Sequence, residues 1–304
     1  GKLAHPRPRP VAFTACIDAL IEGVTLRNSP SWTVNPVACQ HVRIHGIAIH
    51  NPPDSPNTDG INPDSCRNVI ISDCLVSVGD DCITIKSGVE SEDPARLQPC
   101  RDITITNCIL ERGHGGVVIG SEMSGGVRDV VISNCIFKGT DRGIRMKSRR
   151  GRGGVVENIR VSNVIMTDVG CAFTMNLYYG CNGGWGVSRV ADRNALPVDS
   201  GTPAFRSVSL SGIQATGVRY AAAFVWGLPE MPVESLSLQD VVIEMAPDWT
   251  EPGQVEMADG LDDMANQGFF ARNVRGLELS RVRIRGCRGE ARDFDASVVL
   301  AGSI

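Results

Sequence analysis

Three stretches of the chain share one pattern: Val69-Ile-Ile-Ser-Asp-Cys74-Leu-Val76, Ile103-Thr-Ile-Thr-Asn-Cys108-Ile-Leu110 and Val130-Val-Ile-Ser-Asn-Cys135-Ile-Phe137. In each stretch the first and third residues are apolar, the second varies and the fourth is polar. The fifth is Asn, Asp or Gly, and the sixth is Cys, Val or Ile. An apolar alternation of period two predicts β-strands rather than helices. The pattern recurs around six further positions: Val24, Ile47, Val164, Ile213, Val241 and Val282.

The spacing of these nine copies predicts how the strands associate. Successive copies follow after 23, 27, 34, 27, 29, 49, 28 and 41 residues, whereas hairpins would place a strand about every 8–12 residues. One copy cannot bury its own apolar face, so the copies must stack and cover each other. The sequence therefore predicts an all-β chain, residues 1–304, folded as a single-domain right-handed parallel β-helix. Cys74, Cys108 and Cys135 should form a ladder inside it.

Each coil should carry a second strand, and four segments fit: residues 82–86, 116–120, 144–147 and 173–176. Aligned on the serine that follows each strand, they bring polar residues onto one face. In this alignment Asp59 stacks on Asp81, and Asp80 stacks on His114 and Asp141. Asp64, Lys86, Gly120 and Lys147 form one column. Asn62, Thr84, Val118 and Arg145 form the next.

Composition limits the class of protein. Apolar residues make up 42% of the chain and charged residues 21%, which is typical of a globular domain. The net charge of −4 argues against nucleic acid as a partner. No apolar run reaches the ~18 residues that a membrane span needs. The 11 cysteines are odd in number and include no CxxC, which argues against a zinc site.

The clustered carboxylates suggest glycoside hydrolysis. An inverting glycosidase needs one carboxylic acid to protonate the leaving oxygen and one carboxylate to activate water, usually with the two groups ~6.5–9.5 Å apart. Among Asp59, Asp80 and Asp81, two negative neighbours raise the pKa of the third and keep it protonated. Adjacent strand residues point to opposite faces, so Asp80 and Asp81 can both face a cleft only if the backbone turns there; Gly79 suits such a turn.

Each motif could also have a structural role and take no part in catalysis. An Asp-Asp pair beside glycine also suits a turn or a calcium site. His114, between two glycines, also suits a loop, and Arg145 and Lys147 also suit a solvated face. The basic run at residues 149–152 is most simply explained as a solvated loop.

Four motifs in order resemble glycoside hydrolase family 28, the polygalacturonases. They are Asn57-Thr-Asp-Gly60, Gly79-Asp-Asp-Cys82, Gly113-His-Gly115 and Arg145-Met-Lys147. Flanking text such as Asn28-Ser-Pro-Ser-Trp32 is similar too, and the resemblance is strong from about residue 10 to 180.

The resemblance implies an inverting hydrolase of α-1,4-linked galacturonan that needs no metal and no organic cofactor. By motif match, Asp80 is the general acid, Asp59 and Asp81 hold the attacking water, and His114 orients the acid or fixes its protonation. Asn57, Arg145 and Lys147 bind substrate. Tyr178 corresponds to a substrate-contacting tyrosine. The partner is then a polygalacturonate or pectin oligosaccharide, and nothing in the sequence fixes an oligomeric state.

Exo-action is expected because the stretch from Gly113 to Gly126 is similar to exo-acting bacterial members. In addition, the longest interval, from Val164 to Ile213, exceeds the shortest by 26 residues (49 − 23). Such excess forms loops, and Tyr178, Tyr179 and Trp185 in this one could wall off a groove.

Several alternatives stay open. They are an endo-polygalacturonase, a rhamnogalacturonan hydrolase, a calcium-dependent pectate lyase and a non-catalytic carbohydrate-binding β-helix. Family members usually carry more chain before the segment that begins at Arg9, so missing N-terminal coils or a missing cap are expected. The resemblance implies a secreted or periplasmic location; the chain as given shows no signal peptide, and a cytoplasmic location stays open.

Overall fold

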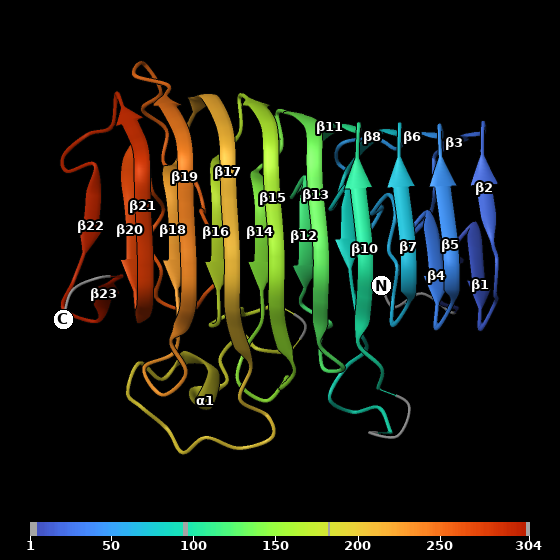
Figure 1. Cartoon of the computed structure of the whole chain (residues 1–304), viewed down its shortest axis with the longest axis horizontal. Helices are drawn as coiled ribbons and strands as arrows, with labels where there is room; N and C mark the ends of the chain where they lie inside the picture. Colours follow the sequence, from blue (N-terminus) through green and yellow to red (C-terminus); the bar gives the residue numbers. More distant parts are fainter. Residues whose placement is uncertain (1–4, 94–96, 182, 302–304) are drawn as a thin grey trace.

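The computed structural model describes residues 5–93, 97–181 and 183–301. The chain rises through one long parallel sheet and descends through a second while it advances from the N-terminal to the C-terminal end (Figure 1). This combination of rotation and advance makes the coil right-handed. The predicted right-handed parallel β-helix is thus confirmed.

The long sheet has fourteen strands, all paired in parallel. Their bounds are β2 (Leu20–Glu22), β3 (Thr25–Arg27), β5 (Gln40–His45), β6 (Ala48–His50), β7 (Arg67–Ser72), β8 (Leu75–Val78), β10 (Cys100–Thr106), β11 (Ile109–Arg112), β13 (Val127–Lys138), β15 (Val155–Thr167), β17 (Ala204–Val218), β19 (Val233–Met245), β21 (Val274–Arg285) and β23 (Val298–Leu300).

The second sheet has seven strands and contains the four segments expected as second strands. Its members are β9 (Ile83–Ile85), β12 (Val117–Gly120), β14 (Arg142–Lys147), β16 (Cys171–Asn176), β18 (Ala221–Trp226), β20 (Gln267–Arg272) and β22 (Arg292–Phe294). A separate pair, β1 (Val11–Thr14) with β4 (Val34–Val37), continues this layer, because isolated bridges join Val34 to Ile61 and Ile61 to Ile83.

The repeat predicted the register of the long sheet. Cys135 pairs with Val164, Val164 with Ile213, Ile213 with Val241 and Val241 with Val282. Cys74, Cys108 and Cys135 are all buried and lie on successive coils, since the amides of Ile109 and Ile136 donate to the carbonyl oxygens of Cys74 and Cys108. All 11 cysteines fall within the described residues, and none forms a disulfide.

The residue before each repeat position has a positive φ, and except at Arg281 it is Asn, Asp or Gly. Asp73, Asn107, Asn134 and Asn163 have φ between 53° and 57°, and Gly212 has φ 59°. Asn, Asp and Gly tolerate this left-handed conformation best. Their side chains also stack, since Asn163 Nδ2 donates to Asn134 Oδ1 at 2.8 Å. The chain therefore turns the same corner in each coil.

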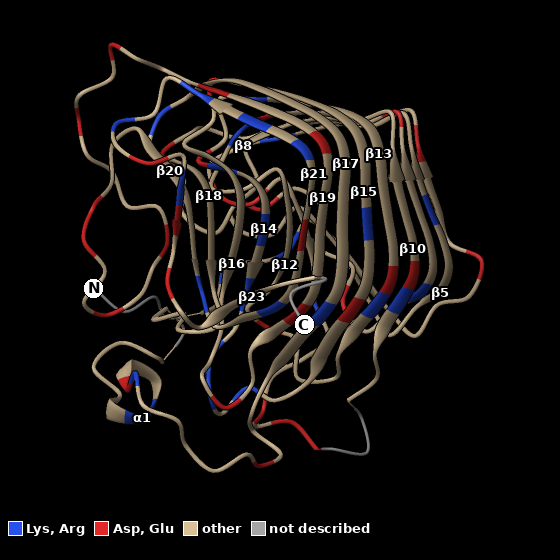
Figure 2. Cartoon of the chain, turned by 60° about the vertical axis from the view of Figure 1, so that its left-hand side comes forward, with Lys and Arg blue, Asp and Glu red and all other residues tan. Residues whose placement is uncertain are grey.

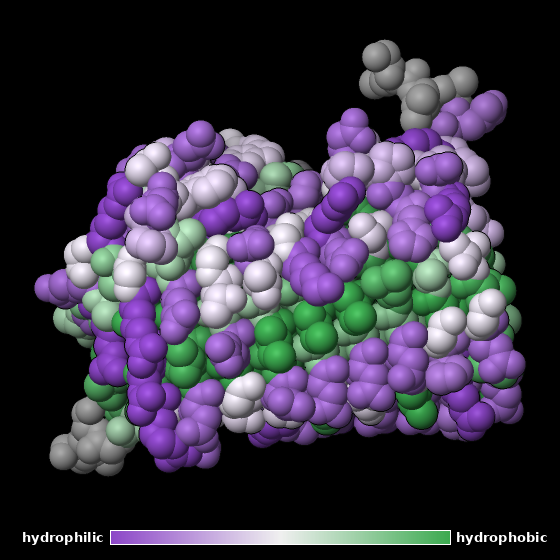
Figure 3. Space-filling model, turned by 90° about the horizontal axis from the view of Figure 1, so that it is seen from above, coloured by the Kyte–Doolittle hydropathy of each residue, from purple (hydrophilic) through white to green (hydrophobic). Residues whose placement is uncertain are grey.

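Outward side chains are sorted in rows as well. Figure 3 shows an apolar band along the face seen from above, and Leu75, Ile109, Ile136 and Ile165 form one outward aliphatic row by register. Charged residues gather at strand ends and in loops (Figure 2), where Arg206 pairs with Glu157 on the neighbouring coil.

Three insertions interrupt the coils: residues 86–93 and 97–99 follow β9, residues 177–181 and 183–203 follow β16, and residues 246–266 connect β19 to β20. The first two leave from the lower end of the stack in Figure 1, and the third leaves from its upper end. The second contains α1 (Ser188–Ala191), the only helix in the described part of the chain. No helix in these residues is long and apolar enough to cross a membrane.

The basic run at residues 149–152 holds two of these insertions in place. Arg150 bonds to Glu230 at 2.6 Å and donates to the carbonyl oxygen of Arg189 at 3.0 Å, while Arg149 and Arg152 both pair with Glu90. The interpretation of this run as a solvated loop was therefore wrong, because acidic side chains and carbonyl oxygens from distant loops bury it.

Candidate active site

A groove of about 670 Å³ lies on the outer face of β9, β12 and β14. Strand alternation places the side chains of Thr84, Lys86, Arg145 and Lys147 on the outer face of the sheet, and the last three form the floor of the groove. The register of this floor agrees with the predicted columns: Asp64 pairs with Lys86, Thr84 with Val118, Val118 with Arg145 and Gly120 with Lys147. The other lining residues are Pro6, Arg7, Arg9, Ser31, Trp32, Pro56, Asn57, Asp59, Asp80, Asp81, His114, Ser121, Glu122, Tyr179, Cys181 and Met257.

The three predicted aspartates meet in this groove. One oxygen from each of Asp59, Asp80 and Asp81 lies within 4.8 Å of the others. The expected spacing of ~6.5–9.5 Å was therefore wrong. The reason is geometric: Asp59 and Asp81 stand on neighbouring coils, which stack at about the ordinary strand separation of ~4.8 Å, and Asp80 is adjacent to Asp81 in the chain.

The backbone between β8 and β9 brings Asp80 and Asp81 to the same side. β8 ends at Val78 and β9 begins at Ile83, so neither aspartate lies in a regular strand. Gly79 is required here because of a close approach and not because of a positive φ. A Cβ on Gly79 would lie 2.5 Å from the carbonyl oxygens of both Pro52 and Ser55.

Of the aspartates in the groove, Asp59 is the one whose environment most favours the protonated form. Burial, together with the negative charges of Asp80 and Asp81, raises its pKa to about 7, although Lys86 and Lys147 oppose the shift. Asn62 Nδ2 donates to Asp59 Oδ2 at 3.0 Å. Asp59 therefore holds a proton to a higher pH than an ordinary aspartate does.

Asp80 and His114 form a second pair. Burial opposes ionisation of Asp80, but a hydrogen bond from His114 and the charge of Lys147 outweigh it and hold the pKa of Asp80 below its ordinary value. The pKa of His114 is raised, chiefly by the same bond, with 3.5 Å between Nδ1 and Asp80 Oδ1. The amides of Asn57 and Asp81 also donate to Asp80, at 3.1 and 2.9 Å. Without substrate, the proton of this pair therefore resides on the imidazole.

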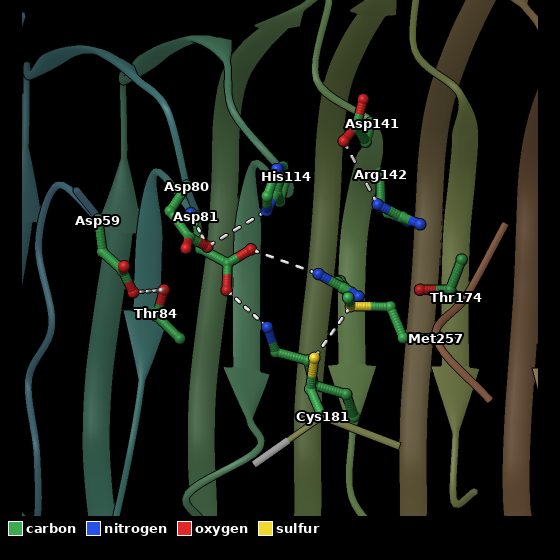
Figure 4. A network of polar contacts seen from close by, with 12 residues as sticks. Asp59, Asp80, Asp81, Thr84, His114, Asp141, Arg142, Thr174, Cys181 and Met257 are labelled. Atoms are coloured by element: carbon green, nitrogen blue, oxygen red, sulfur yellow. Dashed lines mark hydrogen bonds and ion pairs between the residues drawn. The ribbon is translucent and has the colours of Figure 1, made fainter. Parts of the chain in front are cut away.

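Asp81 is surrounded by buried cations (Figure 4). Its Oδ2 accepts from Lys147 Nζ at 2.7 Å, and its Oδ1 lies 3.6 Å from Arg145 NH1. Burial and Arg145 disfavour the charge on Lys147, yet Asp81, with Asp80, raises the pKa of its ammonium above the ordinary value. Asp81 Oδ1 makes no hydrogen bond within the described residues, so it keeps an acceptor.

Glu256 was not found by the sequence analysis. It reaches the floor from the 246–266 insertion, where its oxygens accept from Arg145 Nε at 2.8 Å and NH2 at 3.1 Å and from Thr174 Oγ1 at 2.8 Å. Burial opposes the charge on Glu256, but Arg145 and Arg142 lower its pKa to about 2. Glu256 thus fixes the guanidinium that faces Asp81. No local pattern marks it, although the 41-residue interval from Val241 to Val282 indicated an insertion.

Tyr178 does not reach the groove, so the predicted substrate contact was wrong. Its side chain is buried, with its ring 4.8 Å from that of Trp226 and the Arg193 guanidinium 4.1 Å away. The next residue, Tyr179, lines the groove instead, and Lys147 Nζ lies 5.2 Å from its ring. Trp185, the third aromatic residue expected to wall the groove, does not line it.

The three aspartates could in principle ligate a cation. Their oxygens are close enough, but Lys147 and Arg145 already place two positive charges on Asp81, and His114 places another beside Asp80. A divalent cation would have to overcome this repulsion. The donors present therefore fit a carboxylate centre neutralised by side-chain cations better than a metal site.

Comparison with known proteins places this groove in a family. A "Probable polygalacturonase" of Vitis vinifera is 36% identical over 247 residues, covering 81% of this chain and 48% of that protein. A probable polygalacturonase of Arabidopsis thaliana is 29% identical over 278 residues, covering 90% of this chain and 56% of that protein. The chain thus spans about half the length of the curated relatives it matches.

Solved structures share the fold. The exopolygalacturonase from Thermotoga maritima superposes with a TM-score of 0.74 at 31% identity, covering 93% of this chain and 56% of that one. The polygalacturonase from Erwinia carotovora gives 0.63 at 25% identity, covering 77% and 56%. Residues 2–189, more than half of the chain, match the model of "Glycosyl hydrolases family 28". The chain therefore belongs to this family.

Proposed function

We propose that this chain hydrolyses α-1,4-galacturonosyl linkages in polygalacturonate or pectin, with inversion and from a chain end. The observation that carries the proposal is the meeting of Asp59, Asp80 and Asp81 in one groove whose floor is otherwise cationic. Carboxyl groups supply the acid and the base of glycoside hydrolysis. Buried lysine and arginine suit a sugar that carries a carboxylate. Membership of family 28 and likeness to polygalacturonases support the same assignment.

Asp80 is proposed to donate the proton to the leaving oxygen. It is more exposed than its two partners, with 17% of its side chain accessible, so it faces the groove. In the free chain the proton of the pair lies on His114. An anionic sugar that excludes water disfavours a charged Asp80, and the imidazole can then pass its proton across the 3.5 Å contact. His114 thereby sets the protonation of the acid.

Asp59 and Asp81 are proposed to hold the attacking water. Asp81 is proposed as the residue that orients the water, because Lys147 and Arg145 hold its carboxylate in place and its Oδ1 keeps an acceptor. The spacing within 4.8 Å is also compatible with a retaining pathway, whose carboxyl groups stand ~5–5.5 Å apart. Inversion is therefore supported by the family resemblance alone, and the anomer of the first product decides it.

Substrate recognition is proposed for Asn57, Arg145 and Lys147. Arg145 and Lys147 each have a carboxylate partner already, but an ammonium offers three donors and a guanidinium five, so donors remain for a sugar carboxylate. Tyr179 replaces Tyr178 as the aromatic residue expected to contact the sugar.

Exo-action is supported by the end of the groove beyond β14. The outward residues of β16, Thr174 and Asn176, are buried: Thr174 bonds to Glu256, and Asn176 Nδ2 lies 3.5 Å from the carbonyl oxygen of Met257. The 246–266 insertion therefore covers the sheet at this point. A polymer cannot continue along the floor past β14, as random internal cleavage would require. Because the substrate is extracellular pectin, we also propose a secreted or periplasmic location.

Polygalacturonate incubated with the protein should gain reducing ends while its viscosity falls slowly, and short products should dominate from the first minutes. A sharp fall in viscosity with mixed oligomers would contradict exo-action and leave the hydrolase assignment intact. An absence of new reducing ends would contradict hydrolysis and favour a non-catalytic carbohydrate-binding β-helix. Release only from rhamnose-interrupted pectin would indicate a rhamnogalacturonan hydrolase.

A further inference from the structure

The positively charged side chains of the groove differ in whether a carboxylate group pairs with them. Lys86 pairs with Glu122 at 2.7 Å, Arg145 with Glu256 at 2.8 Å and Lys147 with Asp81 at 2.7 Å. All three cations are buried on the floor. Their charge is largely balanced before any substrate arrives. Attraction for a polyanion must therefore depend strongly on cations elsewhere in the groove.

Two other arginines line the groove, and neither has a carboxylate partner in the described part of the chain. Arg7 donates from NH1 to the carbonyl oxygen of Pro56 and from NH2 to Asn57 Oδ1, both at 2.6 Å. Arg9 donates to Asn35 Oδ1. All of these acceptors are neutral, so no carboxylate among them balances the charge of either guanidinium group.

Both arginines are also held in place and remain open to solvent. The Arg9 guanidinium lies 4.2 Å from the centre of the Trp32 ring, a cation–π contact, and Arg7 is anchored by its two bonds. Arg7 is partly exposed and Arg9 is exposed. A preformed guanidinium that keeps free N–H groups at a groove mouth suits a planar carboxylate, which it can bind through two bonds.

We propose that Arg7 and Arg9 form a separate carboxylate subsite, at the end of the groove opposite the 246–266 insertion, for a galacturonate unit away from the bond that is cut. Asn57 lies between this subsite and the aspartates, because its amide donates to Asp80 and its side chain accepts from Arg7. The subsite rests on the proposed function for the identity of the sugar. It predicts that affinity for an acidic oligomer depends on two residues that take no part in the chemistry.

The test is a calorimetric titration of a galacturonate tetramer into the full chain carrying Asp80→Asn, so that binding is measured without turnover. Adding Arg7→Gln and Arg9→Gln together should weaken binding by about tenfold or more, as expected for lost charge-assisted bonds. The dependence of Kd on salt should also become less steep. Arg43→Gln is the matched control, since Arg43 is an exposed residue on β5, in the other sheet, and outside the groove.

A Kd within twofold of the parent, or an equal loss with Arg43→Gln, would overturn the subsite, as would a parent that binds no tetramer. The reducing-end assay on the unmodified chain tests the proposed function separately. An active chain whose arginine variant binds normally contradicts only the subsite. An inactive chain that loses affinity with the arginines keeps the subsite and contradicts the hydrolase.

Discussion

Replacing Asp80 by asparagine is expected to lower kcat on polygalacturonate by at least about 10²–10⁴-fold, the usual contribution of a general acid. Asparagine has nearly the same shape and can still accept a hydrogen bond from the amide of Asn57 or Asp81, but it cannot carry a transferable proton. Initial rates of reducing-end release measure the effect. The midpoint of thermal unfolding and the affinity for oligomers should change little.

Asp54→Asn is a suitable control for this change, because Asp54 is an exposed carboxylate in the same region of the chain and does not line the groove. It should leave kcat and KM close to those of the unmodified chain. A near-normal rate for the Asp80 variant would refute its role as the acid. Asp59, whose pKa of about 7 already favours a proton, would then become the alternative acid.

Glu256→Ala is expected to lower the free energy of unfolding by about 3–5 kcal/mol, the usual cost of leaving one member of a buried ion pair alone. Arg145 and Glu256 are both almost fully buried, and Arg145 would keep only Asp81, at 3.6 Å, as a carboxylate neighbour. Activity should fall as well, because the guanidinium is then free to move toward Asp81 and occupy its open Oδ1. Denaturant unfolding, followed together with initial rates, measures both effects.

Glu256→Gln separates charge from shape at this position. The amide oxygen can still accept from Arg145 or Thr174, so this variant should lose less stability than the alanine variant but still show reduced activity. Glu251→Ala, in the same insertion and exposed, should change neither quantity. If Glu256→Ala unfolded within 1 kcal/mol of the unmodified chain, the buried ion pair would not hold the insertion over the floor.

The regular part of the fold was predictable because each coil repeats the same local demands. Asn107 and Asn134 mark a left-handed corner, and the apolar residues beside them mark the interior, so aligning the copies also aligned the strands. The same register placed Lys86, Arg145 and Lys147 on one face. The three aspartates then followed from their positions relative to these strands.

The irregular part could not be predicted in this way. Glu256 lies 111 residues from Arg145 in the chain, and nothing near it in the sequence indicates the pairing. Tyr178 and Tyr179 lie in an insertion that has no repeat to fix which side chain faces the groove. Arg150 was expected to face solvent. Its acceptors come from residues 189–194 and 230, and because the repeat does not place these residues, no pattern in the sequence shows that they bury it. Loops that pack on a regular scaffold therefore set the details of the site.

The most direct test is a time-resolved proton NMR spectrum of a galacturonate trimer mixed with the protein, in the presence of a chelator. The predicted result is cleavage into saturated products whose first new reducing end has the β configuration, opposite to the α-linkage that is cut. A first product of α configuration would contradict inversion. An unsaturated product, or loss of activity in the chelator, would indicate a calcium-dependent lyase, and an unchanged trimer would contradict the central claim that these aspartates hydrolyse galacturonan.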